Sequence, residues 1–462
     1  MTEKLNALAE LIGDENIARD ELTLESHGRD WTRFYVPDPM AVVFPRDTAM
    51  VQAIVRFAVA NNIALVPSGG RTGLSGGAVA NQKELVVSFD KMNRILGFNE
   101  TEMTVDVEPG VVTEALQNFA ADKNLLYPVD FASSGSSQIG GNIATNAGGI
   151  KVLRYGLTRD WVLGLTVVTG QGDLLQLNKG LIKNATGYDL RHLFIGSEGT
   201  LGLIVGATLQ LTAPQNQPEV LLLAASRMQD VISVLGCFRE HVTLSAFEFF
   251  SELALQHVLK DKEGTHPFPD AAPYYVLLEF ENHSEGAMEA AMAAFESCLA
   301  EGWVSDGVVS QSGSQRAELW SYREGISEAI TPYTPYKNDI SVRISMVPDF
   351  LDAVEGLVQS QYPEFEIVWF GHIGDGNVHL NILRPEDWDV VDFKAECEKV
   401  STGVMEIVAR FEGSVSAEHG VGLLKREQLG FSRSAQEILL MKGIKQVFDP
   451  AGIMNPGKVF PS

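Results

Sequence analysis

Cysteine is scarce in this chain, with three residues, Cys237, Cys298 and Cys397, among 462. Their odd number, wide spacing and lack of any C-x-x-C pair exclude a disulfide framework and a cysteine-rich zinc module, and they predict a reducing compartment. The N-terminal residues MTEKLNALAELIG lack a basic segment followed by an apolar one, and no run of about 18 apolar residues occurs. The sequence therefore predicts a cytoplasmic protein with no membrane span.

Basic residues are also few, because 35 Lys and Arg face 60 Asp and Glu, which gives a net charge of −25. Such a chain repels phosphate backbones, so the charge excludes nucleic acid as a partner. An anionic small molecule is repelled at long range too and must find a locally cationic pocket. With 45% hydrophobic and 21% charged residues, the composition is that of a folded protein and not of a disordered one.

The fold class expected from the pattern is α+β, and the length suits about three domains, or two with an appendage, at roughly 150 residues each. The segments are listed in chain order: an N-terminal helical segment at 1–37, a first domain at 38–217, a second domain at 218–420 and a C-terminal helical segment at 421–462.

The first half alternates strands with helices. Leu5, Leu8, Leu11 and Ile12 have the spacing of one helix face, and Thr48 is expected to cap a helix that runs to Asn61.

The second half begins after a composition shift at 212–220, which is the candidate linker. Apolar strand patterns then alternate with helices near 228–239 and 285–301, which predicts an antiparallel sheet with helices on one face. The chain turns helical again from about 421.

Glycine is abundant and clustered, in the segments 68–77, 140–149 and 196–202. Glycine lets backbone N–H groups approach a phosphate without a Cβ in the way. None of the clusters is a G-x-G-x-x-G fingerprint or a P-loop. Taken alone, the first cluster is equally compatible with a mobile surface loop. Three such clusters in one domain favour convergence on a long, pyrophosphate-bearing dinucleotide.

Five motifs occur in order along this half: PSGGRTGLSGG at 67–77, IGGNIATNAGG at 139–149, RYG at 154–156, NATGYDL at 184–190 and IGSEGTLG at 195–202. Together they resemble the FAD-binding domain of the vanillyl-alcohol oxidase/PCMH flavoprotein superfamily, over residues 38 to about 213. The resemblance implies a PCMH-type FAD-binding domain, with the pyrophosphate on the first Gly loop and the flavin at the second cluster.

The same resemblance implies how FAD is held. Some relatives attach FAD through His or Cys, and this chain has neither between residues 60 and 160, so non-covalent FAD is expected. The cofactor-binding residues implied by the match are Pro67, Ser68, Gly69, Gly70, Arg71, Thr72, Gly73, Ser75, Gly76, Pro128, Asp130, Gly135, Ser136, Gly140, Gly141, Asn142, Thr145, Asn146, Ala147, Gly148, Gly149, Tyr155, Glu198, Gly199, Ile204 and Asn455.

The segment IVWFGHIGDGNVHLNI, at 367–382, has the pattern of two strands joined by a turn at Asp375–Gly376. A two-residue turn there places His372 opposite His379, with Cβ atoms about 4.5–5.5 Å apart. Two imidazoles so placed can bind one metal ion, although a lone histidine is more often a satisfied core residue.

A third histidine occurs in Ser416-Ala417-Glu418-His419-Gly420, directly after a carboxylate. The chain has only nine histidines, so this second motif adds weight to the metal interpretation. His/His/Glu ligands with open positions suit a catalytic Zn²⁺ or another borderline divalent ion.

This half resembles the C-terminal domain of the FAD-linked 2-hydroxyacid dehydrogenases. In the metal-dependent members the two motifs supply the ligands, which implies His372, His379 and Glu418 as ligands of Zn²⁺, Mn²⁺ or Co²⁺. His419 would be the catalytic base and would contact the substrate, as would Asn377. The tail PAGIMNPGK, at 450–458, matches members whose C-terminus returns to the flavin.

The positions of two cationic side chains suggest the substrate class. In members that act on D-2-hydroxyglutarate, an Arg, a hydroxyl residue four positions later and a Lys about ten further line a carboxylate site, and Arg323, Ser327 and Lys337 match here. For each cation the alternative is a solvated surface charge, and Arg343 stays unassigned.

The resemblance thus implies oxidation of a small anionic D-2-hydroxy acid, foremost D-2-hydroxyglutarate, by hydride transfer to flavin N5. The acceptor expected in place of oxygen is an electron-transfer flavoprotein or a quinone, and a homodimer is the assembly considered. D-lactate or glycolate oxidation is the alternative within the class. A flavin module that only carries electrons, and an aldonolactone or alcohol oxidase, are further alternatives, but neither requires the metal motifs.

Overall fold

A computed structural model describes residues 2–32, 34–215, 218–282 and 286–461 of the chain. The chain forms two units, each with its own hydrophobic cores. Unit 1 comprises Met1–Gly148, Gly156–Pro214 and Glu418–Ser462, and unit 2 comprises Gly149–Tyr155 and Gln215–Ala417. The terminal segments expected at 1–37 and 421–462 therefore both belong to unit 1. Residues 216–217 of the expected linker lie outside the described residues, as does residue 285 of the expected helix.

The elements of unit 1 are, in chain order, α1 (Thr2–Ile12), β1 (Ile17–Ala18), α2 (Glu21–His27), β2 (Ala41–Val43), α3 (Thr48–Asn61), β3 (Leu65–Ser68), β4 (Leu85–Ser88), β5 (Ile95–Asn99), β6 (Thr104–Val107), α4 (Thr113–Asp122), α5 (Ile139–Thr145), α7 (Thr158–Trp161), β7 (Val162–Thr169), β8 (Leu174–Leu177), α8 (Arg191–Phe194), β9 (Gly202–Gln210) and α16 (Ala435–Phe448). They form a four-stranded sheet of order β1-β2-β4-β3 and a five-stranded sheet of order β5-β6-β9-β7-β8.

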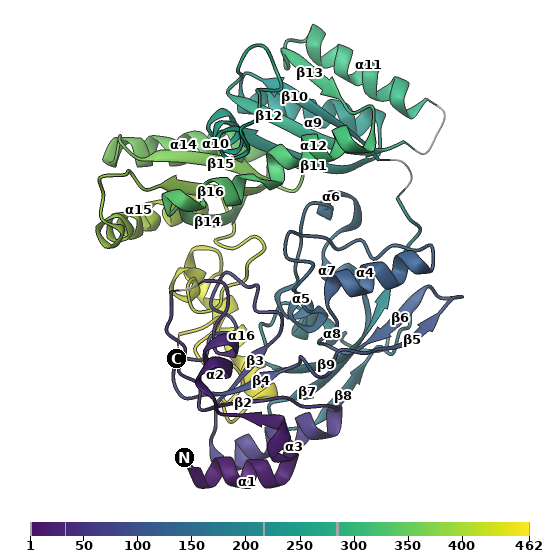
Figure 1. The fold of residues 1–462 in the computed structure, drawn as a ribbon, viewed down its shortest axis with the longest axis vertical. Coiled ribbons are helices and arrows are strands. Elements are labelled where there is room, and N and C mark those ends of the chain that lie inside the picture. Colours follow the sequence, from purple (N-terminus) through teal and green to yellow (C-terminus); the bar gives the residue numbers. More distant parts are fainter. Residues whose placement is uncertain (1, 33, 216–217, 283–285, 462) are drawn as a thin grey trace. The chain divides into compact units, whose positions relative to one another are not determined.

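The four-stranded sheet is parallel across β2, β4 and β3, whereas all pairs of the five-stranded sheet are antiparallel. Helices α1 and α3 bury their apolar faces in one core with the first sheet, and α4 and α5 share another core with the second (Figure 1). The expected α+β class is confirmed. The Gly-rich segments begin where β3 ends, at the start of α5 and just before β9.

The elements of unit 2 are α6 (Val152–Tyr155), β10 (Pro218–Ala225), α9 (Met228–His241), β11 (Leu244–Ser251), α10 (Glu252–Lys262), β12 (Tyr274–Glu281), α11 (Ala287–Ala300), β13 (Asp306–Val309), α12 (Gly313–Glu324), α13 (Ile326–Ala329), β14 (Tyr336–Ser341), α14 (Val347–Gln361), β15 (Glu366–Gly371), β16 (Asn377–Leu383) and α15 (Val390–Arg410). The strands form one antiparallel sheet of order β13-β10-β12-β11-β15-β16-β14.

Helices cover both faces of this sheet, so the expectation of helices on one face is wrong. Leu222 and Leu277 pack with α10, α12 and α13 in one core. Leu223, which points to the opposite face, is fully buried as well, and Phe295 of α11 lies beside it. Strands that are covered on both faces read as continuous apolar runs, as VLLLAA does at 220–225, so the sequence pattern did carry a signal of the second layer.

Two local expectations are corrected in unit 1. Asp47, and not Thr48, is the N-cap of α3, because its carboxylate accepts a hydrogen bond from the N–H of Met50 at 2.8 Å. Leu11 of α1 is 51% exposed, although Leu5, Leu8 and Ile12 are buried as the spacing predicts.

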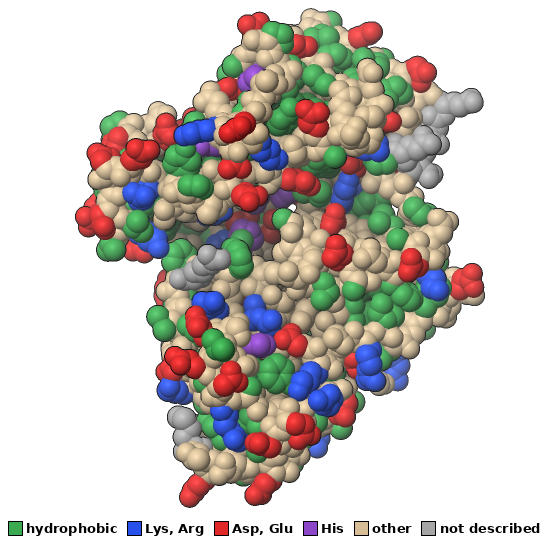
Figure 2. Space-filling view, viewed as in Figure 1, with side chains coloured by type: hydrophobic (Ala, Val, Ile, Leu, Met, Phe, Trp, Pro, Cys, Tyr) green, Lys and Arg blue, Asp and Glu red, His purple; other side chains and the backbone are tan. Residues whose placement is uncertain are grey.

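Acidic and basic side chains are interspersed over the visible surface of each unit (Figure 2). Among the described residues, no helix combines the length and the apolar character that crossing a bilayer requires.

Candidate active site

The three Gly-rich clusters meet inside unit 1. A Cβ on Gly199 would lie 2.5 Å from Cγ of Pro67, so the third cluster touches the start of the first. A Cβ on Gly69 would lie 3.8 Å from Cα of Gly141, which brings the second cluster against the first. Glycine is required at Gly199 in particular, because its φ is +71°. The predicted convergence is therefore present in the fold.

The residues around these clusters fit a large polar cofactor. No atom outside the local helix backbone lies within 4 Å of a Cβ built on Gly141, so this position in α5 faces open space. Two buried side-chain oxygens nearby, Oε1 of Gln138 and Oδ1 of Asn455, have no hydrogen-bond partner within the described part of the chain. Buried polar atoms normally have a hydrogen-bond partner. A cofactor with N–H or O–H donors would fill the open space and supply the partners that these two oxygens lack.

Arg71, predicted to bind the cofactor, is held by its own loop and by a carboxylate. Its guanidinium donates to the carbonyl of Gly69 at 2.9 Å and lies 3.5 Å from Asp90. Burial alone would raise the pKa of Asp90, but the hydrogen bond from His27 and the charge of Arg71 outweigh it and hold the pKa at about 2. Arg71 has a φ of +61°, so this pairing stabilises the loop in a conformation that is unusual for a side chain with a Cβ.

Glu198, also predicted to bind the cofactor, holds the segment that carries His419. Its buried carboxylate accepts hydrogen bonds from the N–H groups of Val421 at 2.7 Å and Gly422 at 2.8 Å. The hydroxyl of Ser75, in the first Gly cluster, donates to the carbonyl of His419 at 2.8 Å. The first and third clusters thus anchor the backbone at this histidine and directly after it.

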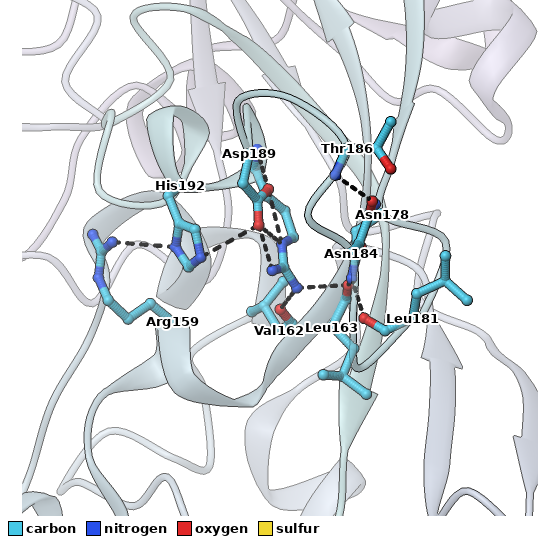
Figure 3. Close-up of polar contacts among 10 residues, drawn as sticks. Arg159, Val162, Leu163, Asn178, Leu181, Asn184, Thr186, Asp189 and His192 are labelled. Carbon is cyan, nitrogen blue, oxygen red and sulfur yellow. Dashed lines mark hydrogen bonds and ion pairs between the residues drawn. The ribbon is translucent and has the colours of Figure 1, made fainter.

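Arg159 links the second and third clusters. Its backbone N–H donates to Oδ1 of Asn146 at 3.0 Å, and its guanidinium donates to the carbonyl of Ile195 at 3.3 Å. The same guanidinium contacts His192 at 3.4 Å, as Figure 3 shows.

The NATGYDL motif lies in a surface loop beside the first residues of β7 (Figure 3). Arg191 pairs with Asp189 and donates to the carbonyls of Val162 at 2.7 Å and Leu163 at 2.6 Å. Tyr188, inside the motif, is 96% exposed. The motif therefore fastens a loop to the sheet with polar contacts.

The remaining predicted cofactor residues occupy these places: Pro67 and Ser68 at the end of β3, Gly70, Thr72, Gly73 and Gly76 in the loop after it, Pro128, Asp130, Gly135 and Ser136 between α4 and α5, Gly140, Asn142 and Thr145 in α5, Ala147, Gly148 and Gly149 after it, and Ile204 in β9. Several of these side chains are engaged within unit 1. The amide of Asn142 donates to Thr113 at 2.7 Å, and Asp130 accepts from Gln117 at 3.1 Å.

Tyr155 of the RYG motif belongs to unit 2. Its hydroxyl donates to Glu281 of β12 at 3.0 Å, and desolvation together with this carboxylate raises the pKa of Tyr155 to about 12. Lys151, from the same short segment, pairs with the buried Glu279. Residues of the FAD-domain sequence are thus held against the sheet of unit 2.

The histidine hairpin of unit 2 forms, but the predicted register is wrong. Phe370, and not His372, lies opposite His379. Strand β15 ends at Gly371 and β16 begins at Asn377, so a five-residue connection replaces the two-residue turn. The slip is two residues, and because side chains alternate with a period of two, both histidines still share a face. Their rings lie 5.4 Å apart between centroids.

The imidazole of His372 contacts a carboxylate from another strand. Its Nδ1 lies 2.8 Å from Oε1 of Glu248 on β11, which is 1% exposed. The second oxygen of Glu248 lies 2.8 Å from the guanidinium of Arg323, whose cation also sits 4.7 Å from the ring centre of Phe370. Burial raises the pKa of Glu248, but His372 and Arg323 outweigh it, so the pKa is lowered.

His379 has a similar arrangement. Its Nδ1 lies 3.7 Å from Oδ1 of Asp339, the residue directly opposite it on β14. Asn377, predicted to contact the substrate, donates its amide hydrogens to Asp339 at 2.8 Å and to the carbonyl of Ile340 at 2.9 Å. Only the carbonyl oxygen of that side chain is therefore left for a ligand.

A ligand nitrogen of His372 lies within 4.8 Å of one of His379. With a carboxylate beside each Nδ1, the other ring nitrogen can carry the lone pair that a metal needs, and metal-binding histidines usually have this second partner. The donor set of unit 2 thus fits a divalent metal ion.

The predicted substrate cations lie on the same sheet face. Lys337 of β14 is opposite Asn381 of β16, two residues from the pair Asp339–His379, and desolvation lowers the pKa of the Lys337 ammonium. Ser327 lies in α13, directly after the helix that carries Arg323.

Three residues of this face were missed by the sequence analysis. Asn381 follows His379 by two positions, so strand alternation could have placed it on the same face. Asp339 follows the predicted Lys337 by two positions and could have been placed in the same way. Glu248 had no such signal, because it lies 124 residues from His372 in sequence.

Glu418 and His419 begin the last segment of unit 1, directly after Ala417. The N–H of Ala417 donates to the carbonyl of Asp339 at 3.4 Å within unit 2. Glu418 therefore directly follows a residue whose backbone is hydrogen-bonded to β14.

Comparison with known families gives two matches that together span most of the chain. The FAD binding domain family matches residues 39–178. The family described as FAD linked oxidases, C-terminal domain, matches residues 214–459.

Among curated proteins, one named D-2-hydroxyglutarate dehydrogenase, from Stutzerimonas stutzeri, is 56% identical over 456 residues, which cover 99% of this chain and 98% of that one. A D-2-hydroxyglutarate dehydrogenase of Xanthomonas citri pv. viticola is 54% identical over 95% of this chain and 92% of its own. The solved structure of p-cresol methylhydroxylase with substrate bound matches with a TM-score of 0.78, covering 100% of this chain and 97% of that one, at 14% identity.

Proposed function

Because the chain belongs to the FAD-linked oxidases of the vanillyl-alcohol oxidase/PCMH superfamily and is an FAD-dependent oxidoreductase, we propose that it oxidises D-2-hydroxyglutarate to 2-oxoglutarate. The observation that carries this proposal is the polar face of unit 2, where two carboxylate-backed histidines lie on the same sheet face as Lys337 and beside the Glu248–Arg323 pair. Relatives with the same named activity support the substrate.

FAD, held without a covalent bond in the Gly-rich clusters of unit 1, would accept the hydride from the substrate α-carbon. A divalent ion held by His372, His379 and Glu418 would lower the pKa of the substrate hydroxyl by several units. The assignment of Glu418 is supported by its position one residue after Ala417, which is bonded to the β14 backbone.

The protein's own groups then have defined tasks. A neutral His419 takes the proton of the substrate hydroxyl as the C–H bond breaks. Ser75 and Glu198 keep that histidine's backbone in place. Arg323 and Lys337 bind carboxylates, which matters in a protein with a net charge of −25, since the overall field repels a dianion. We further propose an electron-transfer flavoprotein or a quinone as the acceptor.

The proposal is tested by following flavin absorbance under anaerobic conditions while D- and L-2-hydroxy acids are added to the holoenzyme. D-2-hydroxyglutarate should bleach the flavin at the lowest concentration and fastest, and its L-isomer should not. Faster bleaching by D-lactate or glycolate would replace the dicarboxylate assignment, and bleaching by no 2-hydroxy acid would remove the reaction class.

Replacing Lys337 tests the specificity. Charge-assisted hydrogen bonds contribute on the order of 1.5–3 kcal/mol, so Lys337→Ala should lower kcat/KM for D-2-hydroxyglutarate by roughly 10- to 100-fold, at about 1.4 kcal/mol per decade. Residual activity on D-lactate, which has no second carboxylate, should change much less. Equal losses on both substrates would mean that Lys337 binds the shared carboxylate or supports the fold.

A further inference from the structure

We propose that Glu248 is a positioning residue that aligns a metal ligand and a substrate-binding cation at once, by holding His372 with one carboxylate oxygen and Arg323 with the other. The inference rests on the proposed function, because it concerns residues to which that function assigns metal and substrate. Neither the motifs nor the family matches assign a role to this residue.

The first part of the argument concerns the tautomer of His372. A carboxylate oxygen accepts hydrogen bonds, so the contact of 2.8 Å between Oε1 of Glu248 and Nδ1 of His372 requires the proton on Nδ1. In the neutral ring the lone pair is then on Nε2, the nitrogen that faces away from Glu248. With Glu248 only 1% exposed, water does not compete for this contact. The buried carboxylate therefore selects both the tautomer and the ring orientation that a metal ion requires.

The second part concerns Arg323, which is 7% exposed. One terminal nitrogen lies 2.8 Å from Oε2 of Glu248, and the guanidinium carbon lies 4.7 Å from the centre of the Phe370 ring. Because the guanidinium is planar, an anchored nitrogen together with the aromatic contact fixes the directions of the remaining N–H donors. Glu248 thus sets where this cation can offer hydrogen bonds to a carboxylate.

The competing interpretation is that Glu248 only neutralises a buried arginine. Removing one member of a buried ion pair leaves an uncompensated charge and destabilises the fold, whatever the role of the pair. A loss of activity in a single variant cannot separate the two interpretations. The affinity for the metal ion can, because charge neutralisation of Arg323 does not by itself require a particular tautomer of His372.

The experiment measures Zn²⁺ affinity of metal-depleted protein that retains FAD, by competition with a chromophoric chelator. Glu248→Gln should weaken Zn²⁺ binding by about 10- to 100-fold, the usual loss when the outer partner of a ligand is removed. The matched control is Glu355→Gln, which changes a partly buried glutamate of α14 that accepts a hydrogen bond from Trp369 of β15 at 2.7 Å. The control should bind Zn²⁺ as the unaltered protein does.

A double variant covers the case in which the single variant does not fold. Glu248→Gln with Arg323→Met removes both charges of the pair, so no buried charge is left alone. Its Zn²⁺ affinity should stay 10- to 100-fold weakened.

If the double variant, or Glu248→Gln itself, binds Zn²⁺ as tightly as the unaltered protein, Glu248 only neutralises Arg323 and the inference is overturned. If the unaltered protein binds no Zn²⁺, the metal assignment of the proposed function fails, and this inference fails with it.

Discussion

Metal depletion should abolish turnover of D-2-hydroxyglutarate while FAD stays bound. The proposed ligands, His372, His379 and Glu418, lie outside the Gly-rich clusters, so a chelator should remove the ion without releasing the flavin. An alkanol is a very weak acid near neutral pH, and a bound divalent ion lowers the barrier to losing its proton by several kcal/mol. At about 1.4 kcal/mol per decade, its loss should lower kcat by at least roughly 100-fold.

The measurement combines three readings on one sample: metal content, flavin absorbance and turnover before and after chelation. Adding back Zn²⁺, Mn²⁺ or Co²⁺ should restore turnover, and the ion that does so best identifies the native metal. His379→Ala should reproduce the loss without chelator and should not be rescued by added ion. Full turnover by protein that contains FAD and no metal would falsify the assignment of these ligands.

Replacing His419 should have the second large effect and should separate the base from the ligands. His419→Ala is expected to lower kcat by about 10²–10⁴-fold, the usual contribution of a positioned acid–base group. Metal content should stay near one ion per chain, and the FAD content should not change, because Ser75 and Glu198 hold the backbone of this segment and not the imidazole.

The control for this prediction is His241→Ala. His241 lies at the end of α9 and its ring contacts the carbonyl of Cys237 at 2.8 Å, so its loss should leave kcat unchanged. If His419→Ala loses the metal together with the activity, His419 is a ligand and the division of roles is incorrect.

Local pattern in the sequence determined more of the fold than of the site. The spacing of Leu5, Leu8 and Ile12 predicts the buried face of α1, because helix periodicity depends only on nearby residues. The strand patterns of the second half likewise predict an antiparallel sheet. The linker expected at 212–220 contains one of the places where the chain passes between units, at Pro214–Gln215.

The candidate residues were found through motifs and family resemblance, while their partners required the tertiary structure. The three glycine clusters together favoured a dinucleotide cofactor, but the clusters are tens of residues apart in sequence, and only the fold brings Gly199 against Pro67. The family resemblance implies Arg71 as a cofactor-binding residue, and the fold pairs its guanidinium with Asp90.

The same distinction between local pattern and tertiary structure applies to the sheet face that carries His372 and His379. The sequence by itself determined that His372 and His379 share a face, because a strand alternates with a period of two and a slip of two residues leaves this unchanged. The sequence could not determine the strand register, which depends on the backbone path through the connection. It also could not show that the carboxylate of Glu248 contacts the imidazole of His372. That contact joins residues 124 positions apart on neighbouring strands of the sheet. Strand order is set by the burial of the whole sheet between two helix layers, and no local pattern contains it.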